Sequence, residues 1–205
     1  ITKFSNIHFA VTKESGKRII KMGEEAWRVH VVGAPGLDDV LDSKIIATEV
    51  IAQKYHLDPA KPILMVTQHP VTIETALAKQ QMTATMSAIK ELGYQAIVVY
   101  PNADAGGREM IKVIEQYRKY PFINTYKNIP RIEYLSLLNI ADVMVGNSSS
   151  GILETPYFHL ATVNIGTRQL GRERAQNVID IGYEKTEIKK VIQKAQEETI
   201  SEIER

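Results

Sequence analysis

PILMVTQHPVTIETALAKQQMTATMSAIKELGYQAIVVY, residues 62–100, contains two apolar runs separated by one helical pattern. The runs at 62–68 and 95–100 are rich in Val and Ile and have the character of buried strands. From Glu74 to Leu92 the apolar residues recur with the ~3.6-residue period of a helix. Two strands joined by a helix are predicted to pair in parallel through a right-handed crossover. The stretch therefore predicts a βαβ unit.

The same alternation extends in both directions along the chain. Further buried strands are expected at 7–11, 28–33, 142–146 and 161–166, and further helices at 107–117, 132–140 and 185–203. Repeated strand–helix units predict an α/β fold with a doubly wound, Rossmann-like parallel sheet and helices on both faces. In such a sheet, ligands bind outside the carboxyl ends of the strands.

Residues 33–39, GAPGLDD, interrupt this alternation. Gly and Pro are expected to stop the preceding strand and to resist helix formation, so the segment has the composition of an inter-domain linker. We expect residues 1–39 to be the remnant of an amino-terminal domain with its linker, 40–184 to be a Rossmann-like domain and 185–205 a carboxyl-terminal helix. The chain starts with Ile1 rather than Met, which is typical of a fragment. Alternatively, the first unit is the edge of one continuous sheet.

Composition excludes several classes of function. Lys and Arg (25) balance Asp and Glu (24), so the chain has almost no net charge that would attract nucleic acid or an anionic membrane surface. The absence of cysteine excludes disulfides, thiolate metal sites and cysteine nucleophiles. No apolar run approaches the ~18–20 residues of a membrane span, and no signal peptide opens the sequence. We expect a cytoplasmic protein with neither nucleic acid nor membrane as a partner.

Polar residues follow each of the two strands of the βαβ unit. His69, held by Pro70, is placed to donate a hydrogen bond to a phosphate, and Thr72 or Glu74 is expected to cap the next helix. In the alternative interpretation His69 only bonds a backbone carbonyl. After residue 100, PNADAGGREM places two glycines before a helix, where free N–H groups favour an anion or the edge of a base. Asn102 in an ordinary Asx-turn is the alternative there.

The loop after the strand at 142–146 is the most informative. Ser148, Ser149 and Ser150 stand at a predicted helix N-terminus, which suits a diphosphate, and Glu154 lies about a turn beyond, where its carboxylate can accept both hydroxyls of a ribose. The pattern is not a Walker loop, a GxGxxG fingerprint or a GxSxG elbow. A serine-rich helix cap is the alternative.

Three arginines in TRQLGRER, residues 167–174, add local positive charge after the last predicted strand, which favours a phosphorylated ligand. The alternative is a solvated charged surface. All four loops are predicted at one edge of the sheet, which favours a single phosphate-binding site.

Four motifs together resemble one enzyme family. HPVTIE from His69, PNADAGGREM from Pro101, GNSSSGILE from Gly146 and NIGTRQLGRERAQNVID from Asn164 are similar to those of the hydrolysing UDP-N-acetylglucosamine 2-epimerases of sialic-acid biosynthesis. The match runs over nearly the whole chain. The resemblance implies a two-domain fold of the glycosyltransferase-B type, of which this chain is the carboxyl-terminal, UDP-binding half.

The resemblance also implies a substrate site and a reaction. The implied substrate-binding residues are His69, Asn102, Asp104, Ser148, Ser149, Glu154 and Arg168. Of these, His69 and the serines would contact the diphosphate, Arg168 the phosphates, Asn102 the uracil side and Glu154 the ribose. The family expels UDP by anti elimination across C1 and C2 and then adds water to give N-acetylmannosamine, with no cofactor and no metal.

The family's proton-transfer carboxylates lie in the amino-terminal domain. We therefore expect no catalytic residue in this chain and no activity from it alone. The family's tendency to assemble implies a homo-oligomer for the full-length protein. A hydrolysing UDP-N,N′-diacetylbacillosamine 2-epimerase, whose sugar contacts would lie largely in the other half, is the nearest alternative. A non-catalytic UDP-binding module and a UDP-sugar glycosyltransferase are further alternatives, whereas the three-serine run departs from the pattern expected of non-hydrolysing 2-epimerases.

Overall fold

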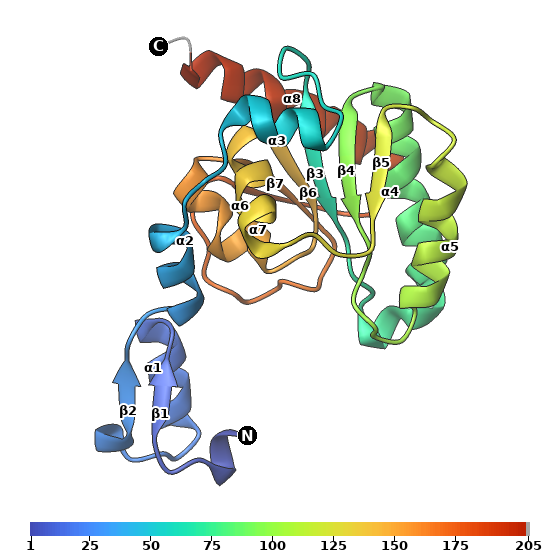
Figure 1. The fold of residues 1–205 in the computed structure, drawn as a ribbon. Coiled ribbons are helices and arrows are strands. Elements are labelled where there is room, and N and C mark those ends of the chain that lie inside the picture. The colour runs from blue at the N-terminus through green and yellow to red at the C-terminus, as the bar shows by residue number, and fades with distance from the viewer. Residues whose placement is uncertain (204–205) are drawn as a thin grey trace. The chain divides into compact units, whose positions relative to one another are not determined.

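The computed structural model describes residues 1–203 and divides into two compact units, Ile1–Ser43 and a second that begins at Lys44. The second unit is built on a six-stranded sheet in which every neighbouring pair is parallel, in the order β5-β4-β3-β6-β7-β8 (Figure 1). This is the strand order of the Rossmann fold. The strands are β3 (Ile63–Thr67), β4 (Gln95–Val99), β5 (Ile123–Tyr126), β6 (Val143–Gly146), β7 (Ala161–Ile165) and β8 (Val178–Ile181).

Strand β3 lies at the centre of this sheet. All five of its residues are buried, as its uninterrupted apolar run predicts for a strand covered on both faces. Leu64 pairs with Ala96 of β4 on one side and with Val143 of β6 on the other. The chain thus winds outward from β3 in one direction through β4 and in the other through β6. The loops that follow β3 and β6 flank this switch point, where ligands of open α/β sheets bind.

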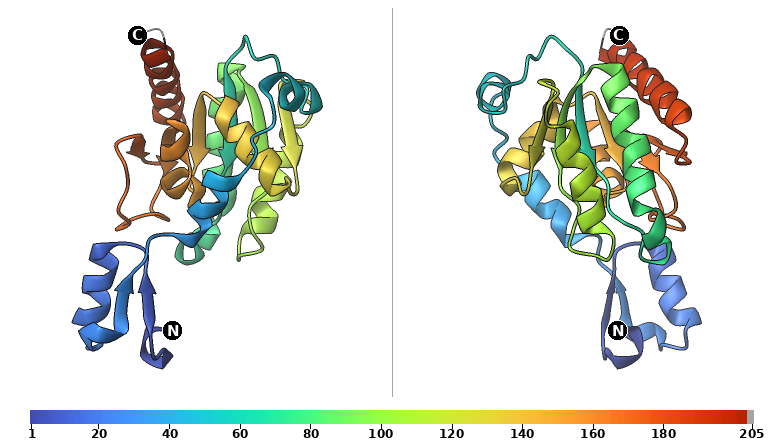
Figure 2. Two further views of the ribbon diagram at one scale, coloured as in Figure 1. Left: turned by 60° about the vertical axis from the view of Figure 1, so that its left-hand side comes forward. Right: turned by 90° about the vertical axis from the view of Figure 1, so that its right-hand side faces the viewer.

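Helices cover both faces of the sheet (Figure 2). One layer contains α4 (Ala78–Leu92), α5 (Gly107–Tyr117) and α8 (Lys185–Ile203), and the other contains α3 (Thr48–Lys54), α6 (Arg131–Ile140) and the short α7 (Ser150–Leu153). Helix α4 buries Met82, Met86 and Ile89, which recur on one face at helical spacing. The predicted doubly wound α/β fold is therefore observed, with helices on both faces as expected.

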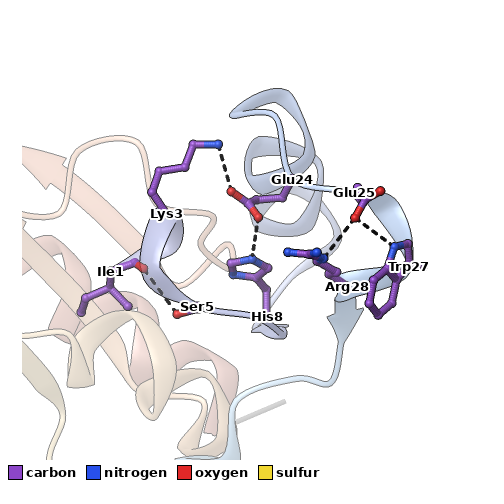
Figure 3. A network of polar contacts seen from close by, with 8 residues as sticks. All are labelled: Ile1, Lys3, Ser5, His8, Glu24, Glu25, Trp27 and Arg28. Carbon is purple, nitrogen blue, oxygen red and sulfur yellow. Dashed lines mark hydrogen bonds and ion pairs between the residues drawn. The ribbon is translucent and has the colours of Figure 1, made fainter.

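The first unit is a small βαβ unit of β1 (His8–Ala10), α1 (Lys13–Lys21) and β2 (Val29–Val31), with β1 and β2 parallel. The expectation of buried strands is wrong here, because Phe9 is 70% and Val31 49% exposed. A two-stranded sheet with one helix leaves much of its apolar surface uncovered. Around this sheet, Glu24 accepts hydrogen bonds from Lys3 (2.9 Å) and pairs with His8 (3.2 Å), as Figure 3 shows.

Several local predictions need correction. Residues 33–39 do not resist helix formation: a 3₁₀ turn, Pro35–Leu37, leads into α2, Asp38–Asp42. Proline is favourable at the first position of a helical turn, and the aspartates suit the first turn of α2. The helix expected from Glu74 is a 3₁₀ segment, Thr72–Leu77, followed by α4, whose N-cap Leu77 makes no side-chain cap.

Strands β5 and β8 and helix α3 were not expected from the sequence pattern. Of the predicted carboxyl-terminal segment, residues 204–205 lie outside the described part. Within residues 1–203, no helix combines the length and apolar character that crossing a membrane requires.

Candidate functional site

Asn147 joins the loops that flank the switch point. Its side chain, 1% exposed, accepts a hydrogen bond from the His69 backbone N–H (2.7 Å) and donates one to the His69 carbonyl (2.9 Å). Because Asn147 directly follows β6 and His69 follows β3, this pair of bonds fixes one loop against the other across the switch point. The backbone N–H and carbonyl of His69 thus both find their hydrogen-bond partner in the Asn147 side chain.

The arginine loop after β7 is attached to the same residue. The carbonyl of Asn147 accepts hydrogen bonds from Arg168 Nη1 (3.1 Å) and from Gln169 Nε2 (2.7 Å). Three of the four predicted loops therefore meet at one asparagine. Asn147 is absent from the predicted site residues. In the sequence Asn147 is a polar residue between the glycine that ends a strand and the serines, a position that indicates a binding site but does not reveal that Asn147 connects the loops.

The fourth loop reaches the same place through His69. The backbone N–H of Asn102 donates to Nδ1 of His69 (3.0 Å), and the Asn102 side chain donates to Asp104 (2.6 Å). In the neutral imidazole the proton is then on Nε2, which can donate to an anion. The pKa of His69 is lowered to about 4, mainly by burial and further by the neighbouring Arg168, against the opposing charge of Asp104. His69 is therefore neutral near pH 7.

The perturbed His69 predicts a pH-dependent stability. Its pKa of about 4 in the folded chain lies below the ~6.5 of an unfolded histidine, so between these values only the unfolded state binds the proton. Stability is thus expected to fall as the pH drops from about 6.5 towards 4. After allowance for solvent screening of a partly exposed ring, we expect wild type to lose about 1 kcal/mol more than His69→Gln between pH 7 and pH 5. Urea unfolding of both proteins at the two pH values measures this, and parallel pH profiles would contradict it.

Arg168 and Asp104 lie within electrostatic reach of each other and of His69. Burial lowers the pKa of Arg168, and the carboxylate of Asp104 acts in the opposite direction on the pKa values of both Arg168 and His69. Two further buried polar atoms at this edge, Gln68 Nε2 and Gln169 Oε1, have no protein partner. A concentration of charged and unsatisfied polar groups at one sheet edge is typical of a binding site.

A pocket of about 320 Å³ opens beside the serines. Its lining includes Ile129, Arg131, Tyr134, Ser148, Ser149 and Glu154. One oxygen of Glu154 pairs with Arg131 and the other accepts from Ser150, whose hydroxyl also accepts from Tyr134 (2.9 Å). Burial is the main cause that raises the pKa of Tyr134 to about 12, so this phenol remains a donor. Arg131 and Tyr134 come from α6 and were not predicted.

The structure thus brings the predicted residues to one edge of the sheet, but in two groups. His69 and Arg168 bond Asn147, and Asn102 with Asp104 joins them through His69. Ser148, Ser149 and Glu154 instead line the pocket. Asn102 does not line that pocket. Within residues 1–203, no group of three or more His, Asp or Glu residues is arranged to hold a metal ion.

A protein-family model described as UDP-N-acetylglucosamine 2-epimerase matches residues 1–205. The chain belongs to this family. The 2-epimerase family predicted from the four motifs is therefore confirmed. The chain is 41% identical over 181 residues to the UDP-N,N′-diacetylbacillosamine 2-epimerase (hydrolyzing) of Legionella pneumophila, and 34% identical over 196 residues to the UDP-N-acetylglucosamine 2-epimerase of Neisseria meningitidis serogroup B.

These alignments cover 88% and 95% of this chain but 48% and 51% of the relatives. The chain thus spans about half the length of the curated 2-epimerases it matches. The crystal structure of the Neisseria meningitidis UDP-GlcNAc 2-epimerase bound to UDP-GlcNAc matches with a TM-score of 0.74 and 14% identity, covering 94% of this chain and 53% of that one. The predicted fold, one half of that larger structure, is confirmed.

Proposed function

We propose that this chain binds the UDP part of a UDP-amino sugar and forms the carboxyl-terminal half of a hydrolysing 2-epimerase, which converts UDP-N-acetylglucosamine to N-acetylmannosamine and UDP. The observation that carries the proposal is the set of hydrogen bonds by which Asn147 joins the His69 and Arg168 loops, next to the pocket that contains Glu154. Membership of the 2-epimerase family supports it.

In this proposal the diphosphate is bound between the two groups of residues. The neutral His69 donates from Nε2, Arg168 supplies the positive charge, and Ser148 and Ser149 donate from their hydroxyls. Asn102 and Asp104 act indirectly, because the Asn102 N–H orients the neutral His69 ring and Asp104 is within electrostatic reach of Arg168 and His69. A neutral histidine suits this role, since it donates without having to gain a proton.

The ribose is assigned to Glu154. Each of its two oxygens already receives one donor, from Arg131 and from Ser150, which fixes the carboxylate in the pocket. An ionised carboxylate has about four acceptor positions, so two remain for the 2′- and 3′-hydroxyls. Arg131 and Ser150 therefore orient the group without exhausting it.

The chemistry assigned to these residues is stabilisation of the leaving group. In an anti elimination, a base removes the proton from C2, the C1–O bond to UDP breaks and its electron pair goes to the diphosphate, leaving a C1–C2 double bond. Water then adds its hydroxyl to C1, and a proton returns to C2. Arg168 and His69 stabilise the charge that develops on the diphosphate. We assign the proton transfers to the amino-terminal domain, where residues 1–39 are proposed to belong; the exposed Phe9 and Val31 of β1 and β2 support that placement.

The alternative candidate substrate is UDP-N,N′-diacetylbacillosamine, which is favoured by the 41% identity to an enzyme named for it. Full-length protein offered each UDP-sugar separates the two substrates. Release of free UDP in the same assay is the signature of a hydrolysing enzyme.

The nucleotide site can be tested with Glu154→Gln. Losing a charged acceptor of the ribose hydroxyls should weaken UDP binding about tenfold. Wild type should also prefer UDP to 2′-deoxy-UDP, and the variant should lose most of that preference, because the discriminating carboxylate is gone. Isothermal titration calorimetry of both nucleotides measures both effects.

Glu91→Gln is the matched control, since Glu91 lies on α4, pairs with Lys185 and does not line the pocket. It should bind UDP like wild type. Equal affinity of wild type and Glu154→Gln for UDP would refute the ribose assignment, and a wild-type chain that does not bind UDP would refute the proposed function.

A further inference from the structure

Glu74 connects the helix that directly follows it to two loops that lie about a hundred positions further along the chain. Its Oε1 accepts a hydrogen bond from Thr167 Oγ1 (2.7 Å), and its Oε2 accepts from Gln81 Nε2 (2.7 Å) and from Tyr183 Oη (3.0 Å). Thr167 follows β7, Gln81 belongs to α4 and Tyr183 follows β8. The Glu74 backbone departs from helical geometry within the 3₁₀ segment (φ −118°, ψ 22°). The carboxylate is thus held by three different parts of the fold.

These contacts depend on an ionised carboxylate. The hydrogen bond from Thr167 is the largest cause that lowers the pKa of Glu74, with Gln81 and Tyr183 acting in the same direction against burial. All three partners donate, and an ionised carboxylate accepts only. A neutral amide of the same shape would present a donor to at least one of them.

Tyr183 fits closely against the backbone next to the arginine loop. Gly166 has a φ of +78°, and a Cβ there would come within 2.0 Å of Tyr183 Oη. The absence of a side chain at Gly166 is what admits the phenol to Glu74. Gly166 is followed directly by Thr167 and Arg168, so the same contact fixes the start of the loop that carries the arginine.

Arg168 therefore lies between two attachments. On one side Thr167 is bound to Glu74, and on the other Gln169, together with Arg168 itself, is bound to the carbonyl of Asn147. Glu74 belongs to the segment that follows His69, and Asn147 bonds His69 directly. Both attachments thus connect the arginine loop to the histidine loop, and two points prevent a rotation that a single point would allow.

We propose that Glu74 is a positioning residue that holds the Arg168 loop against the His69 loop and so sets the geometry with which the chain binds a diphosphate. The inference rests on the proposed function, because it assigns His69 and Arg168 to the diphosphate. Glu74 itself contacts no phosphate in this scheme. Its effect should therefore be confined to the part of the affinity that the diphosphate contributes.

The test compares UDP with uridine, which lacks the diphosphate, in Glu74→Gln. UDP should bind about tenfold more weakly to the variant than to wild type, whereas uridine affinity should stay within about twofold. Tyr183→Phe, which keeps the ring against Gly166 and removes one donor, should weaken UDP about threefold, again without affecting uridine. Calorimetry measures UDP, and chemical-shift titration of the same chain measures the weaker uridine.

Glu24→Gln is the matched control, because Glu24 is also a carboxylate with two partners, Lys3 and His8, but belongs to the other unit. It should bind both ligands like wild type. Equal weakening of UDP and uridine in Glu74→Gln would mean a general structural role and would overturn the inference, as would unchanged UDP affinity. If wild type binds UDP no better than uridine, the diphosphate assignment fails first and this inference fails with it.

Discussion

Replacing Asn147 with aspartate should lower the free energy of unfolding by about 3 kcal/mol and abolish measurable UDP binding. The side-chain amide donates to the His69 carbonyl at 2.9 Å, and a carboxylate would place an acceptor against that acceptor. At 1% exposure the new charge would also be buried without a cation bonded to it. Urea unfolding at pH 7 and calorimetry with UDP measure the two effects.

The control is the same substitution at Asn139, an exposed residue of α6. Asn139→Asp should change the stability by no more than about 0.5 kcal/mol and leave UDP binding intact. A loss below about 1 kcal/mol in Asn147→Asp would show that the two loops do not depend on this residue. Weakened UDP binding without destabilisation would instead place Asn147 in direct contact with the nucleotide.

Only the strands of the sheet that are covered on both faces could be predicted from the sequence. β3, β4, β6 and β7 are mostly buried and rich in apolar residues because helices cover both faces of the sheet, although β7 also buries Thr162 and Asn164. β5 and β8 are the two edges of the sheet, have four residues each and carry polar side chains such as Asn124 and Asp180. A short, half-exposed edge strand lacks the continuous run that identifies a central one.

That the four loops meet at one edge of the sheet was predictable for a geometric reason, but the contacts between them were not. Parallel strands place the loops at their carboxyl ends along one edge, so polar motifs after β3, β4, β6 and β7 must come close. Which atoms meet depends on pairs far apart in the chain, such as Glu74 with Tyr183, which are separated by 109 positions. From local pattern alone either Thr72 or Glu74 was expected to cap a helix. The hydrogen bonds of Glu74 with Thr167 and Tyr183 compete with that role, and a local pattern carries no information about partners so far along the chain.

Gly146→Ala should have the largest effect on stability, a loss of roughly 4 kcal/mol or failure to fold. Gly146 has a φ of +129°, and a Cβ there would come within 2.1 Å of the Thr67 carbonyl oxygen and 2.6 Å of its carbon. Both are backbone atoms of the paired central strand, so neither can move aside as a flexible side chain would. The substitution must either separate β6 from β3 at the switch point or change the backbone of residues 146 and 147. Urea unfolding, or soluble yield with circular dichroism if the variant does not fold, measures the loss.

Gly182→Ala is the control within the same unit, because its backbone is not in the left-handed region and a Cβ would meet only the end of the Glu187 side chain, at 3.4 Å. It should be neutral within about 0.5 kcal/mol. A loss below about 2 kcal/mol in Gly146→Ala would mean that the end of β6 can relax, contrary to the close approach of the two backbones. That approach also lets the Asn147 N–H reach the Thr67 carbonyl at 3.1 Å, which places the Asn147 side chain on His69. A folded Gly146→Ala chain should therefore bind UDP weakly, since Gly146 directly precedes Asn147, whose hydrogen bonds connect the His69 and Arg168 loops.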